Sequence, residues 1–131
     1  MKLINSNNKT VKISVKESDY PLKTETSAKS KIQFNCGKLI KDHFPSDPIL
    51  EDVPVDGASF YFDFWLPRRK IVFEIQGRQH DQYVKFYHKD KNSYFKSIDR
   101  DLKKEEFCRI NDIKLFYART IEELEKLLAT V

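Results

Sequence analysis

Two acidic residues, Asp63 and Glu74, lie inside stretches of sequence that are otherwise apolar and typical of buried strands. A carboxylate in such a stretch costs several kcal/mol, on the order of its desolvation energy, unless a cation or hydrogen bonds compensate its charge. Pro67 lies between the two acids and interrupts the strand. A hairpin of this length can bring both carboxylates to one end of a sheet, and this arrangement predicts a site for a divalent metal ion.

Such a pair of acids supports hydrolysis that is assisted by a hard divalent cation. Mg²⁺ prefers oxygen ligands, typically one or two carboxylates, with water and substrate phosphate oxygens as the remainder. The cation polarises a phosphoryl group and lowers the pKa of a bound water. Gln76 leaves the strand on the same face as Glu74, where its amide can orient the attacking water or add a neutral ligand. The structural alternative is two acids at strand ends, exposed or paired with Arg68 and Arg69.

A series of short motifs runs in a fixed order along residues 27–118. They are Ser30-Lys31, the stretches 63–67 and 71–77, the pair His80-Asp81, and the stretches 101–104 and 111–115. This set resembles the core of the PD-(D/E)XK nuclease superfamily, in the branch of the very-short-patch-repair and phage EDxHD homing endonucleases. The resemblance implies a restriction-endonuclease-like fold and metal-dependent hydrolysis of DNA, with Mg²⁺ as the cofactor and Mn²⁺ as a substitute.

The resemblance also implies roles for individual residues. Asp63 is the principal metal ligand and Glu74 the second. His80 is the general base or donates a hydrogen bond to the scissile phosphate, because a histidine titrates near neutral pH. The alternative for His80 is a loop histidine without a function. Asp81 orients the imidazole, contacts a metal-bound water, or is simply solvated.

Two positions depart from the family pattern. Gln76 stands where the superfamily has a lysine, and Gln33 stands where a helix glutamate is often found. Fewer carboxylates predict weaker metal binding, by one ion rather than two. Lys104 is the candidate to replace the missing lysine by reaching over the sheet to stabilise phosphate charge; the alternative is a solvated helix lysine. The departures also keep open a catalytically inactive nuclease-fold module that binds nucleic acid.

Segment 78–104 mixes cations with aromatic rings. Cations that neutralise phosphates, interleaved with rings that stack on bases, indicate a nucleic-acid surface, although four acids dilute the signal. The candidate DNA-binding cations are Arg78, Lys85, Lys89, Lys91, Arg100 and Lys103. The rings are Tyr83, Phe86, Tyr87, Tyr94 and Phe95.

The spacing of apolar residues predicts the elements that must position these groups. We expect a helix within 27–44 with Ser27 or Ser30 as its cap, strands over 49–55, 58–66 and 70–76, a loop over 78–96, a helix over 98–110, a strand over 113–118 and a last helix from Thr120. The helical crossover makes the last two strands a parallel pair. The predicted fold class is α/β, with a mixed four-stranded sheet flanked by helices.

The whole chain sets further bounds. Its 131 residues predict one domain. With the resemblance, this is a nuclease-like α/β domain over 27–131, preceded by a polar segment over 1–26 with a peripheral strand near 10–16. A net charge of +4 fits DNA as the partner. No stretch reaches the ~20 apolar residues of a membrane span, and no signal-peptide core is found. We therefore expect a cytoplasmic protein, in the host cytoplasm if it is phage-encoded, as the resemblance suggests. A chain this short has little room for a separate sequence-reading domain, so the nuclease that the resemblance implies is expected to nick DNA or to cut it in a structure-directed way. A homodimer would supply the second active site for a double-strand break.

Overall fold

A mixed sheet of four strands forms the centre of the molecule, in the order β3-β4-β5-β6. The computed structural model describes residues 2–4, 10–12, 20–55, 60–75 and 91–131. The strands are β3 Leu50–Pro54, β4 Tyr61–Leu66, β5 Ile71–Ile75 and β6 Lys114–Ala118. β3, β4 and β5 are antiparallel neighbours, whereas β5 and β6 are parallel. The predicted α/β class, the mixed four-stranded sheet and its parallel pair are confirmed.

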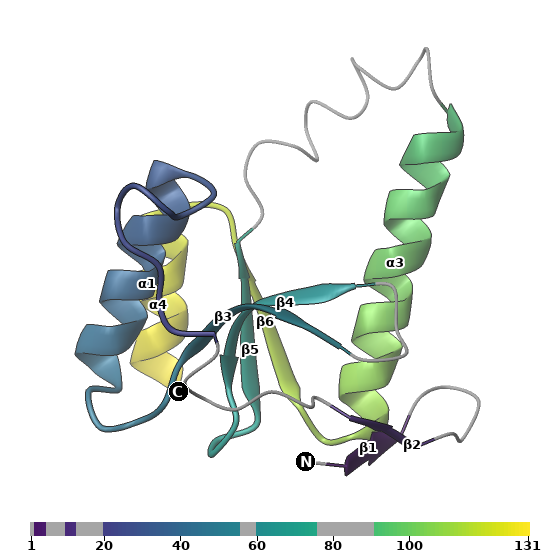
Figure 1. Ribbon diagram of the computed structural model, residues 1–131, viewed down its shortest axis with the longest axis horizontal. Coiled ribbons are helices and arrows are strands. Elements are labelled where there is room, and N and C mark those ends of the chain that lie inside the picture. The colour runs from purple at the N-terminus through teal and green to yellow at the C-terminus, as the bar shows by residue number, and fades with distance from the viewer. Residues whose placement is uncertain (1, 5–9, 13–19, 56–59, 76–90) are drawn as a thin grey trace.

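Helices cover the sheet on both sides. α1 Lys31–His43 and α4 Ile121–Thr130 lie next to each other on one side, and α3 Lys91–Ile110 lies on the other (Figure 1). Each side has its own apolar cluster. The cluster under α1 and α4 contains Cys36, Ile40, Phe64, Phe73, Leu124 and Leu128; the cluster under α3 contains Val53, Phe62, Trp65, Val72, Phe107 and Cys108. The sheet is therefore buried on both faces.

The caps of α1 and α4 follow from the sequence. The Ser30 hydroxyl accepts a hydrogen bond from the Gln33 backbone N–H at 3.1 Å, and the Thr120 hydroxyl accepts one from Glu123 N–H at 3.1 Å. Of the two predicted caps for the first helix, Ser30 is the one observed. Gly37 lets α1 approach the sheet, because a Cβ at this position would lie 3.1 Å from the Phe64 ring. The close approach of Gly37 to Phe64 places α1 directly over β4.

The prediction for α3 is wrong in two respects. The helix begins at Lys91 and not at residue 98, so 91–96 do not belong to a loop, and 78–90 lie outside the described residues. The side that faces the sheet is also different. Helical spacing of the apolar residues Ile98, Leu102 and Ile110 predicts Leu102 on the apolar face, but Leu102 is 59 % exposed, whereas Phe107 and Cys108 are buried. The helix turns this way because Phe107 packs against Phe60, with ring centroids 5.7 Å apart.

A separate two-stranded sheet lies at the N-terminal end. β1 Lys2–Ile4 pairs with β2 Thr10–Lys12 in an antiparallel arrangement. The peripheral strand predicted near 10–16 is present over 10–12, and 13–16 lie outside the described residues. The chain then returns to the core, where Tyr20 and Leu22 pack against the two apolar clusters and the Glu51 backbone N–H donates to the Tyr20 carbonyl at 3.0 Å.

A pair of alanine substitutions tests the orientation of α3. Phe107→Ala should lower the free energy of unfolding by about 3–5 kcal/mol, because it removes a buried ring. Leu102→Ala should change it by no more than about 0.5 kcal/mol, because that side chain is exposed. Urea denaturation followed by circular dichroism measures both. Comparable losses for the two variants would contradict the observed orientation.

Candidate functional site

The carboxylates of Asp63 and Glu74 meet where β4 and β5 separate. The paired register of these strands ends at Phe64 and Phe73. Beyond it, the Asp63 backbone N–H donates to Glu74 Oε2 at 2.7 Å, and the Ile75 backbone N–H donates to Asp63 Oδ2 at 2.9 Å. Side-chain oxygens thus take the donors that a regular ladder would pair with carbonyls. The predicted proximity of the two acids is confirmed, and each carboxylate is fixed by the backbone of the neighbouring strand.

Lys104 reaches this pair from α3. Its ammonium donates to Glu74 Oε1 and lies 5.8 Å from the centre of the Phe60 ring. The residue is only 8 % exposed. Lys104 is therefore a buried partner of Glu74, and the alternative of a solvated helix lysine is wrong.

A third acid, Asp52, lies beside Asp63 on the next strand. β3 and β4 keep a constant register, with Glu51 opposite Phe64 and Val53 opposite Phe62, so Asp52 lies opposite Asp63. Asp52 has a φ of 53°, in the left-handed region that few residues other than glycine adopt. Across β3, β4 and β5, three carboxylates therefore follow one another in a row.

The alternation of side chains breaks at this row. Phe62 packs in the cluster under α3, but Phe64 packs in the cluster under α1 and α4, although the two lie two positions apart in one strand. On β3, both Glu51 and Asp52 bond to Gln33 of α1, although they are neighbours. In a regular strand, residues two positions apart point to the same face, and neighbouring residues point to opposite faces. The irregularity places the side chains of Glu51 and Asp52 together on the α1 side.

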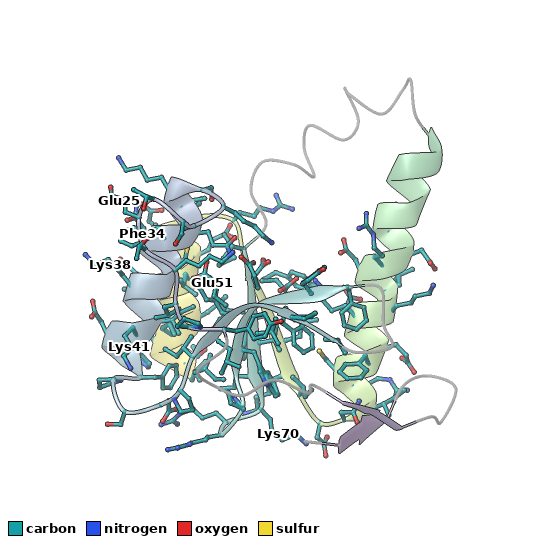
Figure 2. All side chains as sticks on the ribbon, viewed as in Figure 1. Glu25, Phe34, Lys38, Lys41, Glu51 and Lys70 are labelled. Carbon is teal, nitrogen blue, oxygen red and sulfur yellow. The ribbon has the colours of Figure 1, made fainter. Side chains whose placement is uncertain are left out.

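Residues near the start of α1 complete a polar network with these acids. Gln33 Nε2 donates to Glu51 Oε2 at 3.1 Å and to Asp52 Oδ1 at 3.2 Å. Lys23 Nζ lies 2.5 Å from Asp52 Oδ2, and its backbone N–H donates to Glu51 Oε1 at 2.9 Å. Lys29 Nζ lies 2.9 Å from Asp52 Oδ1 and 3.8 Å from Asp63 Oδ1. Figure 2 shows Glu51 between α1 and the sheet.

Burial has the largest effect on the pKa values of Asp63 and Glu74, and it raises both. Burial, followed by repulsion from Asp63, raises the pKa of Glu74 to about 7, although Lys104 acts in the opposite direction. Burial also raises the pKa of Asp63, against the effects of the Ile75 N–H and of Lys29. For Asp52, burial acts to raise the pKa, but hydrogen bonds from Lys23 and Lys29 outweigh it and the pKa is lowered. Lys104 and Lys29 therefore offset the burial of Glu74 and Asp63 only in part, and a further cation would stabilise the charged forms of both carboxylates.

Several predicted site residues lie elsewhere or outside the described part of the chain. Gln76, Arg78, His80, Asp81, Lys85 and Lys89 fall within 76–90, which the structure does not describe, and the same holds for the Lys91 side chain. Arg100 and Lys103 are exposed on α3, and Lys103 pairs with Asp99 at 2.9 Å. Arg69 bonds to Asp47 and lies over the Phe44 ring, so it is not the partner of the two acids that the structural alternative required.

Sequence reasoning missed part of the network. The sequence patterns did not place four of its residues at the site: Lys23, Lys29, Glu51 and Asp52. Gln33 was considered only as the residue that stands in place of the family's helix glutamate. The available signal was the adjacent pair Glu51-Asp52 within an otherwise apolar strand, which repeats the pattern that drew attention to Asp63 and Glu74.

The oxygen atoms of Asp63 and Glu74 fit a hard divalent cation in number and type. Mg²⁺ is usually bound by one or two carboxylates together with water and substrate phosphate oxygens. Both oxygens of Glu74 and Oδ2 of Asp63 each accept one hydrogen bond and retain a further lone pair, and Asp63 Oδ1 has only its 3.8 Å ion pair with Lys29. Among the described residues, no group of three or more histidine, cysteine, aspartate or glutamate side chains is arranged to hold a metal ion. Any cation at this pair would therefore depend on water or on the substrate for most of its ligands.

Comparisons with known proteins add no family assignment. No family model matches the chain, and neither the curated proteins nor the solved structures contain a match. Within the described residues, no helix is long and apolar enough to cross a membrane.

The raised pKa of Glu74 makes the stability of the protein depend on pH. A carboxyl that titrates at about 4.5 when unfolded and at about 7 when folded binds its proton more tightly in the native state. Its contribution is complete below about 4.5 and is lost as the pH rises through about 7. In the presence of a chelator, the melting temperature should therefore fall over this range, and Glu74→Gln should flatten the decline.

Glu125→Gln is the matched control, because Glu125 is exposed on α4. Differential scanning calorimetry over a pH series gives the comparison. If Glu74→Gln and Glu125→Gln both keep the wild-type pH dependence, Glu74 does not titrate in this range and the account of the pair is wrong.

Proposed function

We propose that this chain is a metal-dependent endonuclease that hydrolyses DNA phosphodiester bonds, with Asp63 and Glu74 as the ligands of Mg²⁺. The observation that carries the proposal is the meeting of two largely buried carboxylates in the gap between β4 and β5. Their pKa values are raised, so a bound divalent cation would offset both the cost of burying the two charges and the repulsion between them. The order of motifs that resembles the PD-(D/E)XK superfamily supports the same chemistry.

In this proposal the metal ion supplies the chemistry, and residues of the chain hold its ligands in place. Mg²⁺, when bound, supplies Lewis-acid polarisation of the phosphoryl group and a more acidic water. Backbone N–H groups of Asp63 and Ile75 fix the directions of the two carboxylates, which limits the reorganisation needed during the reaction. Lys104 fixes Glu74 from the α3 side. A direct contact between Lys104 and a phosphate would require its ammonium to leave Glu74.

The remaining roles come from the resemblance. His80, five residues after the end of β5, is the proposed general base or phosphate donor, with Asp81 as its neighbour, and Gln76 directly follows Ile75. One such centre cuts one strand of a duplex. We therefore propose nicking or structure-directed cleavage by the single chain, with Mn²⁺ able to replace Mg²⁺, and a double-strand break only through a homodimer.

A catalytically inactive module that binds nucleic acid is the second candidate. One observation favours it: Lys104 already supplies a positive charge to Glu74, and every oxygen of that carboxylate accepts a hydrogen bond. In this case the pair of acids would serve the fold alone. DNA binding that is insensitive to chelator and to Asp63→Asn, without any cleavage, would favour this candidate.

Substitution of the two acids tests the proposed activity. Asp63→Asn and Glu74→Gln should each reduce Mg²⁺-dependent nicking of supercoiled or branched DNA by at least about 100-fold, because the metal ion supplies several kcal/mol of transition-state stabilisation. The conservative amides preserve volume, and circular dichroism checks that both variants fold. Glu125→Gln should cut like the wild type. Undiminished cleavage by Asp63→Asn, or no cleavage by the wild type with either metal, would contradict the proposal.

A further inference from the structure

Lys29 is the most exposed cation in the network around the three acids. Its side chain is 55 % exposed, compared with 33 % for Lys23 and 10 % for Lys104. Lys104 is occupied by Glu74 on the α3 side of the sheet. An anion that approaches the acids from solvent on the α1 side would therefore meet the ammonium of Lys29 before the other two.

The charge around Asp52 leaves Lys29 available to a further anion. Two ammonium groups, from Lys23 and Lys29, contact the single carboxylate of Asp52 at 2.5 and 2.9 Å, and Gln33 donates a third hydrogen bond. The second acid near Lys29, Asp63, is farther away at 3.8 Å. Lys29 therefore shares the charge of Asp52 with Lys23 and has only this longer contact to Asp63, so that the charge of its ammonium is compensated only in part, with or without a metal ion.

The backbone fixes this arrangement. The left-handed conformation of Asp52 directs its carboxylate to the α1 side, where Lys29 lies one residue before the Ser30 cap of the helix. The contacts of Asp52 with Gln33 and Lys23 hold it there. The ammonium of Lys29 is thus positioned beside Asp63 and not left to move freely in solvent.

We propose that Lys29 contacts a phosphate of the nucleic acid next to Asp63, and that Asp52 positions its ammonium. The inference rests on the proposed function of this site and names a binding residue that the motif resemblance does not include. A phosphodiester is a monoanion with oxygen acceptors, which suits an ammonium held at a fixed place beside the hydrolytic centre.

Salt-dependent binding in the absence of metal tests this inference. The fluorescence anisotropy of a labelled DNA duplex is measured in EDTA over a series of NaCl concentrations. Loss of one phosphate contact should reduce the slope of log K against log salt by about 0.9. We expect this reduction for Lys29→Gln and not for Lys126→Gln, a control on the exposed side of α4, and we expect Lys29→Arg to keep the wild-type slope.

The outcomes separate this inference from the proposed function. A wild-type slope for Lys29→Gln, an equal change for Lys126→Gln, or no measurable binding by the wild type would overturn the role of Lys29. Cleavage by Asp63→Asn at the wild-type rate would overturn the hydrolytic centre, whatever the slopes are. Thermal melting of the Lys29 variants excludes unfolding as the cause of a reduced slope.

Discussion

The separation of β4 from β5, held open by two carboxylates, is the constraint on which the rest of the site depends. Asp63 and Glu74 each accept a backbone N–H from the opposite strand, so the acids replace ladder hydrogen bonds that the sheet would otherwise make. This exchange lets carboxylates lie inside a sheet that is buried on both faces. It also leaves negative charge in a place where burial raises the pKa of both groups. A bound cation or a proton would neutralise this negative charge.

The two helical layers supply cations to this gap from opposite sides. Lys104 comes from α3 and bonds to Glu74, whereas Lys29 lies just before α1 and faces Asp63 and Asp52. A line of polar side chains therefore passes through the sheet between β4 and β5. The apolar clusters on the two sides, with Phe107 in one and Phe64 in the other, hold α3, which carries Lys104, and α1, which Lys29 precedes. Packing and charge compensation are thus linked in this fold.

Local patterns were sufficient for β3 to β6, for α1 and α4 and for the central pair of acids, but not for the start of α3 or for β1. Alternation, Pro67 and the crossover rule predicted the hairpin, its two carboxylates and the parallel pair. The face of α3 was not predictable, because Leu102 satisfies helical spacing while the contacts of Phe107 and Lys104 decide the rotation. The position of the Asp52 side chain was not predictable, because its left-handed backbone interrupts the two-residue alternation from which the faces of a strand are predicted. The network of Lys23, Lys29 and Gln33 required tertiary contacts that no local pattern contains.

Calorimetric titration of the protein with Mg²⁺ near neutral pH tests the central claim most directly. We expect saturable uptake accompanied by proton release, seen as a heat that changes with the ionisation enthalpy of the buffer, because the metal must displace the proton that the raised pKa holds on Glu74. Asp63→Asn should abolish this uptake. If the wild type takes up no Mg²⁺, or if the variant takes it up equally well, the carboxylates serve the fold alone and the hydrolytic centre proposed for them is wrong.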